Sequence, residues 1–184
     1  MSGFRHLGDD DVHLGYVWKV VRARFAAPDG AVFERDIVRS PGAVGVVPLV
    51  FDPEGLPSVV LVEQYRPAYE RTVIEIPAGM RDVPGEPPEG TGHRELVEEA
   101  GLDAGELVHL VDIYPSPGMT DSVCSVFLAT DCTTVDHDRH GPEEQEMQLL
   151  HVPLDDALAM IDRGEINDAK TVAGLLATER RLRR

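Results

Sequence analysis

The segment from Gly79 to Leu102 constrains the fold and the chemistry of this chain more than any other part of the sequence. It reads GMRDVPGEPPEGTGHRELVEEAGL and ends in a run of carboxylates. Glu95, Glu98 and Glu99 are spaced so that a helix carries all of them on one face, and Gly101 is a typical residue to end that helix. Like charges at this spacing destabilise a helix by roughly 0.2–0.5 kcal/mol per pair. A hard divalent cation such as Mg²⁺ or Mn²⁺ would turn that cost into a binding site.

Acidic residues on a helix are most often a solvated face, so the neighbouring sequence has to decide between the two interpretations. A strand-like run, 72–76, precedes Gly79, and Glu86 lies in the loop before the helix. Strand, glycine loop and carboxylate helix together resemble the Nudix box. Between Gly79 and Glu86 the chain has one residue more than the family pattern, whereas the spacing from Glu86 to Arg94 agrees with it. The extra residue falls in the loop, so it displaces no helix ligand.

Composition and charge exclude several classes of function. The chain has 184 residues and a net charge of −16, which argues against binding to a nucleic-acid backbone. It contains no apolar run long enough to span a membrane, and its first residues do not resemble a signal peptide. The two cysteines lack metal-ligand spacing, which favours free thiols in a reducing compartment. We therefore expect a cytoplasmic protein with no membrane or nucleic-acid partner.

Hydrophobic patterning predicts a mixed α/β fold. Residues 16–25 and 31–38 are expected to form a hairpin around the turn at 28–30, and the apolar run 43–51 a strand buried on both faces. Further strands are predicted at 58–65, 72–76, 107–114, 122–130 and 147–152, with helices at 155–163 and 168–182. Asn167 is a plausible N-cap for the last helix. The start of the carboxylate helix should be irregular, because Gly90 and Gly92 lie in it and Pro87 or Pro88 fixes its first turn.

The resemblance to Nudix enzymes implies a Nudix α/β/α sandwich with a mixed sheet, preceded by a small N-terminal antiparallel β-hairpin region. We divide the chain into an N-terminal hairpin region, 1–42, and a Nudix hydrolase domain, 43–184. The resemblance also implies metal-ligating roles, which fall on Glu95 and Glu99, on Glu98 as an assisting ligand and on the backbone carbonyl of Ala78. Arg94 and Glu86 are expected to pair and to hold the glutamates in place, which we favour over the alternative of a surface salt bridge.

Three further segments resemble ADP-ribose pyrophosphatases of the Nudix superfamily, with the actinobacterial type looking most similar. They are Glu63–Arg66, Glu75–Gly79 and Ser116–Asp121. Pro117 matches a proline that this subfamily carries beyond the box. Met119 and Ser122 depart from the Phe and Glu that are frequent in the subfamily.

The same resemblance implies a substrate site. The catalytic base of these enzymes lies on a loop that matches 141–146, where we favour Glu144 and then Glu143 over a reading as exposed loop acids. Arg66 matches an arginine that contacts the phosphates or the terminal ribose, and Glu75 an acid near the metal site. The remaining expected substrate contacts are Arg35, Trp18, Pro117 and Gly118.

Trp18 could stack on adenine or could simply pack within the hairpin. A two-stranded hairpin is marginally stable alone, and in the resembling family N-terminal strands cover the partner's site. We therefore expect a homodimer.

These features together predict Mg²⁺-dependent hydrolysis of ADP-ribose to AMP and ribose 5-phosphate. A sugar nucleotide or a dinucleotide is the alternative substrate, because the same carboxylates would serve any pyrophosphate. A non-catalytic nucleotide-binding Nudix module and a structural protein with an acidic helix are the alternatives outside the enzyme class.

Overall fold

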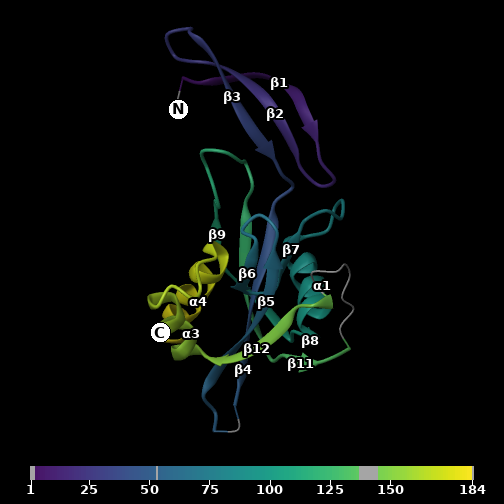
Figure 1. Cartoon of the computed structure of the whole chain (residues 1–184), viewed down its shortest axis with the longest axis vertical. Helices are drawn as coiled ribbons and strands as arrows, with labels where there is room; N and C mark the ends of the chain where they lie inside the picture. The colour runs from purple at the N-terminus through teal and green to yellow at the C-terminus, as the bar shows by residue number, and fades with distance from the viewer. Residues whose placement is uncertain (1–2, 53, 137–144, 184) are drawn as a thin grey trace. The chain divides into compact units, whose positions relative to one another are not determined.

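The structure is a computed structural model that describes residues 3–52, 54–136 and 145–183 (Figure 1). The contacts between residues divide the chain into two units. The first unit consists of Met1–Gly42 and Tyr114–Val123, and the second of Ala43–Ile113 and Cys124–Arg184. Residues 114–123 thus group with the N-terminal strands, although they follow far later in the sequence.

The first unit contains a three-stranded antiparallel sheet in the order β1-β2-β3. Its strands are β1 (Arg5–Leu14), β2 (Lys19–Ala26) and β3 (Val32–Arg39). The expected hairpin is confirmed as β2 and β3, with the Asp29 carboxylate accepting the Ala31 amide in the turn. Strand β1 was not predicted, because it is exposed along most of its length and carries no apolar alternation.

The segment 114–123 is fixed to β3 by backbone and side-chain contacts. The Val38 amide donates to the Met119 carbonyl, and the Thr120 hydroxyl donates to the Val38 carbonyl. The Asp121 carboxylate accepts hydrogen bonds from Arg39 Nη1 at 3.1 Å and from the Ser40 amide at 3.0 Å. The loop between two later strands therefore completes the N-terminal unit.

Among its described residues, the second unit contains a mixed sheet of seven strands with the central order β12-β5-β4-β10-β9. Its strands are β4 (Ala43–Phe51), β5 (Pro57–Arg66), β6 (Arg71–Glu75), β7 (Ala78–Met80), β9 (Glu106–Ile113), β10 (Cys124–Thr130) and β12 (Gln148–Pro153). Strands β4 and β10 are parallel, and the other pairs are antiparallel. Strand β6 pairs with β5, and β7 pairs with β4, next to the start of the carboxylate segment. Short strands β8 (Leu102–Asp103) and β11 (Thr133–Thr134) pair separately.

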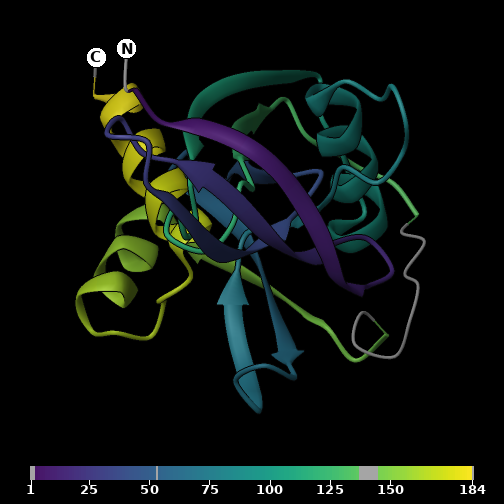
Figure 2. The same ribbon diagram turned by 90° about the horizontal axis from the view of Figure 1, so that it is seen from above.

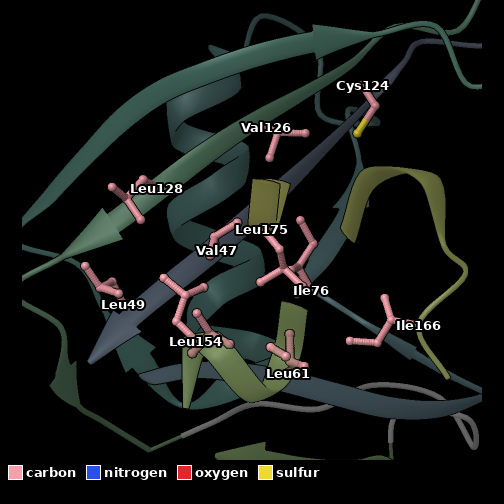
Figure 3. Close-up of a cluster of buried hydrophobic side chains, with 12 residues drawn as sticks. Val47, Leu49, Leu61, Ile76, Cys124, Val126, Leu128, Leu154, Ile166 and Leu175 are labelled. Carbon is pink, nitrogen blue, oxygen red and sulfur yellow. The ribbon is translucent and has the colours of Figure 1, made fainter. Parts of the chain in front are cut away.

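Helices cover both faces of this sheet. Helix α1 (Pro88–Ala100) lies on one face, and helices α3 (Leu154–Asp162) and α4 (Ala169–Leu182) lie on the other (Figures 1 and 2). The cluster under α3 and α4 includes Val47, Leu61 and Leu175, all fully buried (Figure 3). A second cluster under α1 contains Leu96 and Phe127. The expected α/β/α sandwich with a mixed sheet is confirmed.

Two local expectations about the helices were wrong. Helix α1 is regular from Pro88 onward: Pro88 fixes its first turn, as expected, and Gly92 fits closely against β4 and β9, where a larger residue would crowd Val44 and Leu107. Asp168, not Asn167, caps α4, since its carboxylate accepts the Thr171 amide. The Asn167 amide instead donates to the Gly164 carbonyl. Gly101 ends α1 at φ 61°, as expected.

Both cysteines, Cys124 and Cys132, are free thiols. None of the described helices has the length and apolar character needed to cross a membrane.

Candidate metal and substrate site

Helix α1 buries two of its carboxylates in the second unit. Only 9% of Glu95 and 5% of Glu99 is exposed, so these residues are not a solvated helix face. Glu98 is partly buried on the same helix. Burying charged carboxylates costs free energy unless other groups compensate them. Strand β7 and Arg94 supply part of that compensation.

Strand β7 fits closely against the buried glutamates. A Cβ atom added at Gly79 would overlap the carboxylate of Glu95, so only glycine leaves this side chain its place. The Ala78 amide donates to Glu99 Oε2 at 2.8 Å. The Pro77 carbonyl accepts the Val46 amide, which ties the turn before β7 to β4. The segment before the box is thus shaped around the two carboxylates that the sequence singled out.

Arg94 connects four acidic side chains around the helix. Its Nη1 lies 2.6 Å from Glu95 Oε1 and 3.1 Å from Glu98 Oε2. Its Nη2 lies 3.4 Å from Glu86 Oε2 and 3.7 Å from Asp82 Oδ1. Burial opposes the charged form, but the hydrogen bond to Glu86 and the charges of Glu95 and Glu98 raise the Arg94 pKa above its usual range.

Glu86 lies two residues before the first residue of α1, and its carboxylate also accepts a hydrogen bond from the Thr91 hydroxyl at 2.8 Å. The hydrogen bonds from Thr91 and then Arg94 lower the pKa of Glu86. The expected pairing of Arg94 with Glu86 is present, and it extends to the helix carboxylates themselves. Its role in catalysis stays a prediction.

Arg66 and Glu75 form a close ion pair at the ends of β5 and β6. Arg66 Nε donates to Glu75 Oε1 at 2.6 Å, and Nη2 donates to Oε2 at 2.7 Å. Burial opposes ionisation of Glu75, but hydrogen bonds from Arg66 and the charge of Lys170 lower its pKa. The structure therefore brings these two expected substrate residues together.

Lys170 and Asp168 belong to this group but were missed by the sequence analysis. Lys170 Nζ contacts Glu75 Oε2 and lies 3.0 Å from Asp168 Oδ2. No spacing rule connects a lysine in the last helix with an acid on a strand nearly a hundred residues earlier. The only sequence signal for Lys170 was a lysine in the first turn of an amphipathic helix, and that position alone does not indicate a partner.

The donor set on α1 fits a hard divalent cation. Glu95, Glu98 and Glu99 offer carboxylate oxygens from one helix face, and the missing side chain of Gly79 leaves the Glu95 carboxylate its place there. Within residues 3–52, 54–136 and 145–183, no three His, Cys, Asp or Glu side chains already converge as a metal site. Arg94 instead neutralises the glutamates, so a bound cation would have to share or replace its contacts.

The first unit holds the other expected substrate residues around two cavities of its own. Arg35, Pro117 and Gly118 line a cavity of about 510 Å³. The Arg35 guanidinium lies 4.9 Å from the centre of the Phe33 ring, which lines the same cavity. Trp18 lines a second cavity of about 330 Å³ and is 46% exposed.

Several lining residues of the larger cavity were missed by the sequence analysis. They are Phe4, Phe25, Phe33, Ile37 and Arg39. The alternation of large apolar residues along β2 and β3 was the available signal, but it is also typical of sheet packing. The expected catalytic base, Glu144 or Glu143, lies outside the described residues.

Comparison with known proteins supports the fold that these layers define. A crystal structure of an ADP compounds hydrolase superposes with a TM-score of 0.82, covering 98% of this chain and 94% of that chain at 22% identity. This likeness shows the fold. The model of the NUDIX domain family matches residues 39–175. The chain belongs to the NUDIX family, whose hydrolases generally use divalent metal ions.

Two relatives that match most of the chain are ADP-ribose pyrophosphatases. The ADP-ribose pyrophosphatase of Bacillus subtilis is 40% identical over 144 residues, or 78% of this chain and 75% of that protein. The ADP-ribose pyrophosphatase of Mycobacterium tuberculosis is 36% identical over 174 residues, or 95% of this chain and 82% of that protein. A GDP-mannose pyrophosphatase of Citrobacter koseri is 35% identical over 122 residues, covering 62% of this chain and 63% of that protein. The resemblance to ADP-ribose pyrophosphatases, with an actinobacterial relative among them, is confirmed.

Proposed function

We propose that this protein hydrolyses the pyrophosphate bond of ADP-ribose to AMP and ribose 5-phosphate and that Mg²⁺ supports the reaction. The observation that carries the proposal is the buried pair Glu95 and Glu99, around which Gly79 and the Ala78 amide are fitted. The names of two relatives that match most of the chain support ADP-ribose as the substrate.

In the proposed mechanism, Glu95, Glu98, Glu99 and the Ala78 carbonyl would hold the metal. A bound divalent cation would neutralise charge on the pyrophosphate and lower the pKa of a bound water. Mn²⁺ could substitute for Mg²⁺, since both prefer oxygen ligands.

The side chains around this centre have distinct proposed roles. Arg94 orients Glu95 and Glu98 and is itself held by Glu86. Arg66, fixed by Glu75, binds phosphate oxygens.

A water molecule attacks one phosphorus atom of the pyrophosphate, and the bond from that phosphorus to the bridging oxygen breaks. Glu144, with Glu143 as the alternative, takes the proton of the attacking water. The bridging oxygen leaves on the other phosphate, so that each product carries one phosphate group.

We propose that the first unit recognises the adenosine end of the substrate. Arg35, Pro117 and Gly118 line an apolar cavity that suits a purine, and Trp18 offers a further exposed aromatic face. We also propose that residues 1–42 form the N-terminal region of a cytoplasmic homodimer and cover the partner's site, with 43–184 as the Nudix domain.

A sugar nucleotide is the second candidate substrate, because GDP-mannose pyrophosphatases are among the relatives of this chain. The helix carboxylates would serve either substrate. Discrimination would have to come from the groups that contact the base and the terminal sugar.

Hydrolysis of a substrate panel tests the proposal. AMP release from ADP-ribose is measured with Mg²⁺ beside GDP-mannose and a dinucleotide, using wild type, Glu99→Gln, Glu144→Gln and the exposed control Glu106→Gln. We expect preference for ADP-ribose, a loss of at least about a hundredfold for Glu99→Gln, and a strong loss for Glu144→Gln. Preference for GDP-mannose would move the assignment to the second candidate.

Light scattering at micromolar concentration tests the dimer. A fully active monomer would contradict the proposal that residues 1–42 complete the partner's site.

A further inference from the structure

Lys170 is held in a fixed position by the start of helix α4. Asp168 Oδ2 accepts the Thr171 amide at 3.0 Å and the Thr171 hydroxyl at 2.6 Å. The Thr171 hydroxyl in turn accepts the Ile76 amide at 2.8 Å, and Thr171 is fully buried. The first turn of α4 is therefore tied directly to the residue that follows Glu75.

From this position Lys170 reaches the carboxylate of Glu75. Only 15% of the Lys170 side chain and 4% of the Glu75 side chain is exposed, so water screens their interaction weakly. Glu75 Oε2 accepts hydrogen bonds from both Lys170 and Arg66. One buried carboxylate is thus paired with two cationic side chains.

The charges of this group explain why a second cation matters. Arg66 and Glu75 alone would cancel, and a neutral pair in a chain of net charge −16 would not attract a pyrophosphate. Lys170 adds a positive charge, while the negative charge of Asp168 lies at the N-terminus of α4, where the helix dipole already stabilises it. The four charges sum to zero, but because Asp168 is held by the start of α4, Lys170 shares the charge of Glu75 with Arg66.

Arg66 is the member of the group that can meet a ligand. Its side chain is 38% exposed, and Glu75 engages two of its five N–H donors. The hydrogen bond from Arg66 to Glu75 raises the Arg66 pKa, and the negative charge of Glu99 on helix α1 raises it further.

We propose that Lys170 is a positioning residue for substrate binding: by sharing Glu75 it fixes this carboxylate and leaves the positive charge of Arg66 less fully neutralised when the phosphates bind. This inference rests on the proposed function. Lys170 acts through Glu75 and Arg66 and does not itself touch the reacting atoms.

Steady-state kinetics of ADP-ribose hydrolysis with Mg²⁺ test the role of Lys170. We compare wild type, Lys170→Met and the matched control Arg163→Met, which also removes a cation from a glutamate but at an exposed site. We expect Lys170→Met to raise KM about tenfold and to leave kcat within about threefold. Arg163→Met should leave both constants unchanged.

A purely structural role would give a different pattern. An unchanged KM in Lys170→Met, with a lower thermal midpoint or a lower kcat, would overturn the proposal. Lys170 would then only stabilise the fold. Calorimetric binding of ADP-ribose without added metal gives a second readout, and the Kd should also rise about tenfold. This binding comparison decides on Lys170 even if wild type fails to cleave ADP-ribose, a result that would refute only the proposed function.

Asp168→Asn provides a test in the opposite direction that also holds if Lys170→Met does not fold. Asparagine keeps an oxygen that can cap α4, but it removes a negative charge beside Lys170. We expect KM to fall about twofold or more. An unchanged or higher KM in a folded Asp168→Asn protein would contradict the proposed charge effect.

Discussion

The missing side chain of Gly79 is the residue-scale feature on which the carboxylate site depends most directly. The atoms that a Cβ at this position would overlap belong to the end of the Glu95 side chain, which can turn away without unfolding the protein. The substitution should therefore affect the site far more than the fold.

We predict that Gly79→Ala displaces Glu95 and lowers kcat/KM by at least about a hundredfold, to the level of Glu95→Gln. The two substitutions together should cost no more than either alone, because both act on one carboxylate. Enzyme kinetics on the two single variants and the double variant, with the thermal midpoint measured beside them, test this expectation. Additive losses, or an unfolded Gly79→Ala protein, would contradict it.

The thiols of Cys124 and Cys132 give a second residue-scale prediction. Burial raises the pKa of each to about 11, from a usual value of 9.0. At pH 8 the folded protein should hold about a hundredfold less thiolate than the unfolded chain, so alkylation should be correspondingly slow. Mass spectrometry after iodoacetamide treatment, with and without denaturant, measures the difference. Equal labelling rates in both states would show that the thiols are accessible and ionised.

At the scale of elements, helix α4 is set against the sheet by its one internal glycine. A Cβ at Gly174 would lie 2.8 Å from Val47 Cγ2 and 3.1 Å from Val126 Cγ1, both in the core cluster under α4. The helix can approach the sheet this closely only without a side chain at this position.

We predict that Gly174→Ala destabilises the protein by about 1–3 kcal/mol through overpacking, despite the higher helix propensity of alanine. Leu176→Ala on the exposed side of the same helix serves as the control and should change stability by less than about 1 kcal/mol. Urea unfolding curves for both variants test the contrast. A stabilised Gly174→Ala protein would mean that the helix can move away from β4 at no cost.

Strands β1 and β3 of the first unit are joined by Asp9 and Arg39. Arg39 Nε and Nη2 donate to the two Asp9 oxygens at 2.9 and 3.0 Å. The hydrogen bond from Arg39 lowers the Asp9 pKa to about 2, against a smaller opposing effect of burial. Because the folded pKa lies below the usual 3.8, Asp9 stabilises the fold above about pH 4 and loses this effect as the pH falls towards 2.

We predict that Asp9→Asn is less stable than wild type at pH 7 and that the difference disappears between about pH 4 and pH 2. Trp18, the single tryptophan of the chain, lies in this unit and reports its unfolding by fluorescence. Asp10→Asn is the control, since Asp10 is exposed and lies 3.6 Å from Arg24. A difference between wild type and Asp9→Asn that persists at pH 2 would contradict the assigned pKa.

The elements also show how far the sequence alone could lead. The apolar run that became β4, the hairpin of β2 and β3 and the carboxylate helix were all predictable, because each follows a local pattern of polarity or turn residues. Strand β1 lacks such a pattern, and the N-cap of α4 was predicted one residue too early, at Asn167 instead of Asp168. Lys170 joined the candidate site through tertiary packing, and no local rule describes that.

At the scale of the whole molecule, charge is the dominant feature. A net charge of −16 implies repulsion among many carboxylates, which the Arg94 and Lys170 groups offset only locally. Screening by salt should therefore stabilise the folded chain.

We predict that raising NaCl from about 10 mM to 150 mM raises the thermal midpoint by a few degrees at pH 7.5, since the screening length falls from about 30 Å to about 8 Å. EDTA is present so that no divalent cation contributes. At a pH near the sequence pI of about 4.7, the same change of salt should have little effect. An equal salt effect at both pH values would mean that net charge is not its cause.

The first unit is built from two separate segments, Met1–Gly42 and Tyr114–Val123, and this limits how the chain can be recombined with a relative. Exchanging only the N-terminal segment with that of a relative would separate β3 from the loop whose Thr120 and Asp121 bind to it. A functional chimaera would need both pieces from the same parent. The first unit is thus encoded in two separate stretches of sequence, and a substitution in one stretch has to remain compatible with the other, although most of the Nudix sheet and its carboxylate helix lie between them.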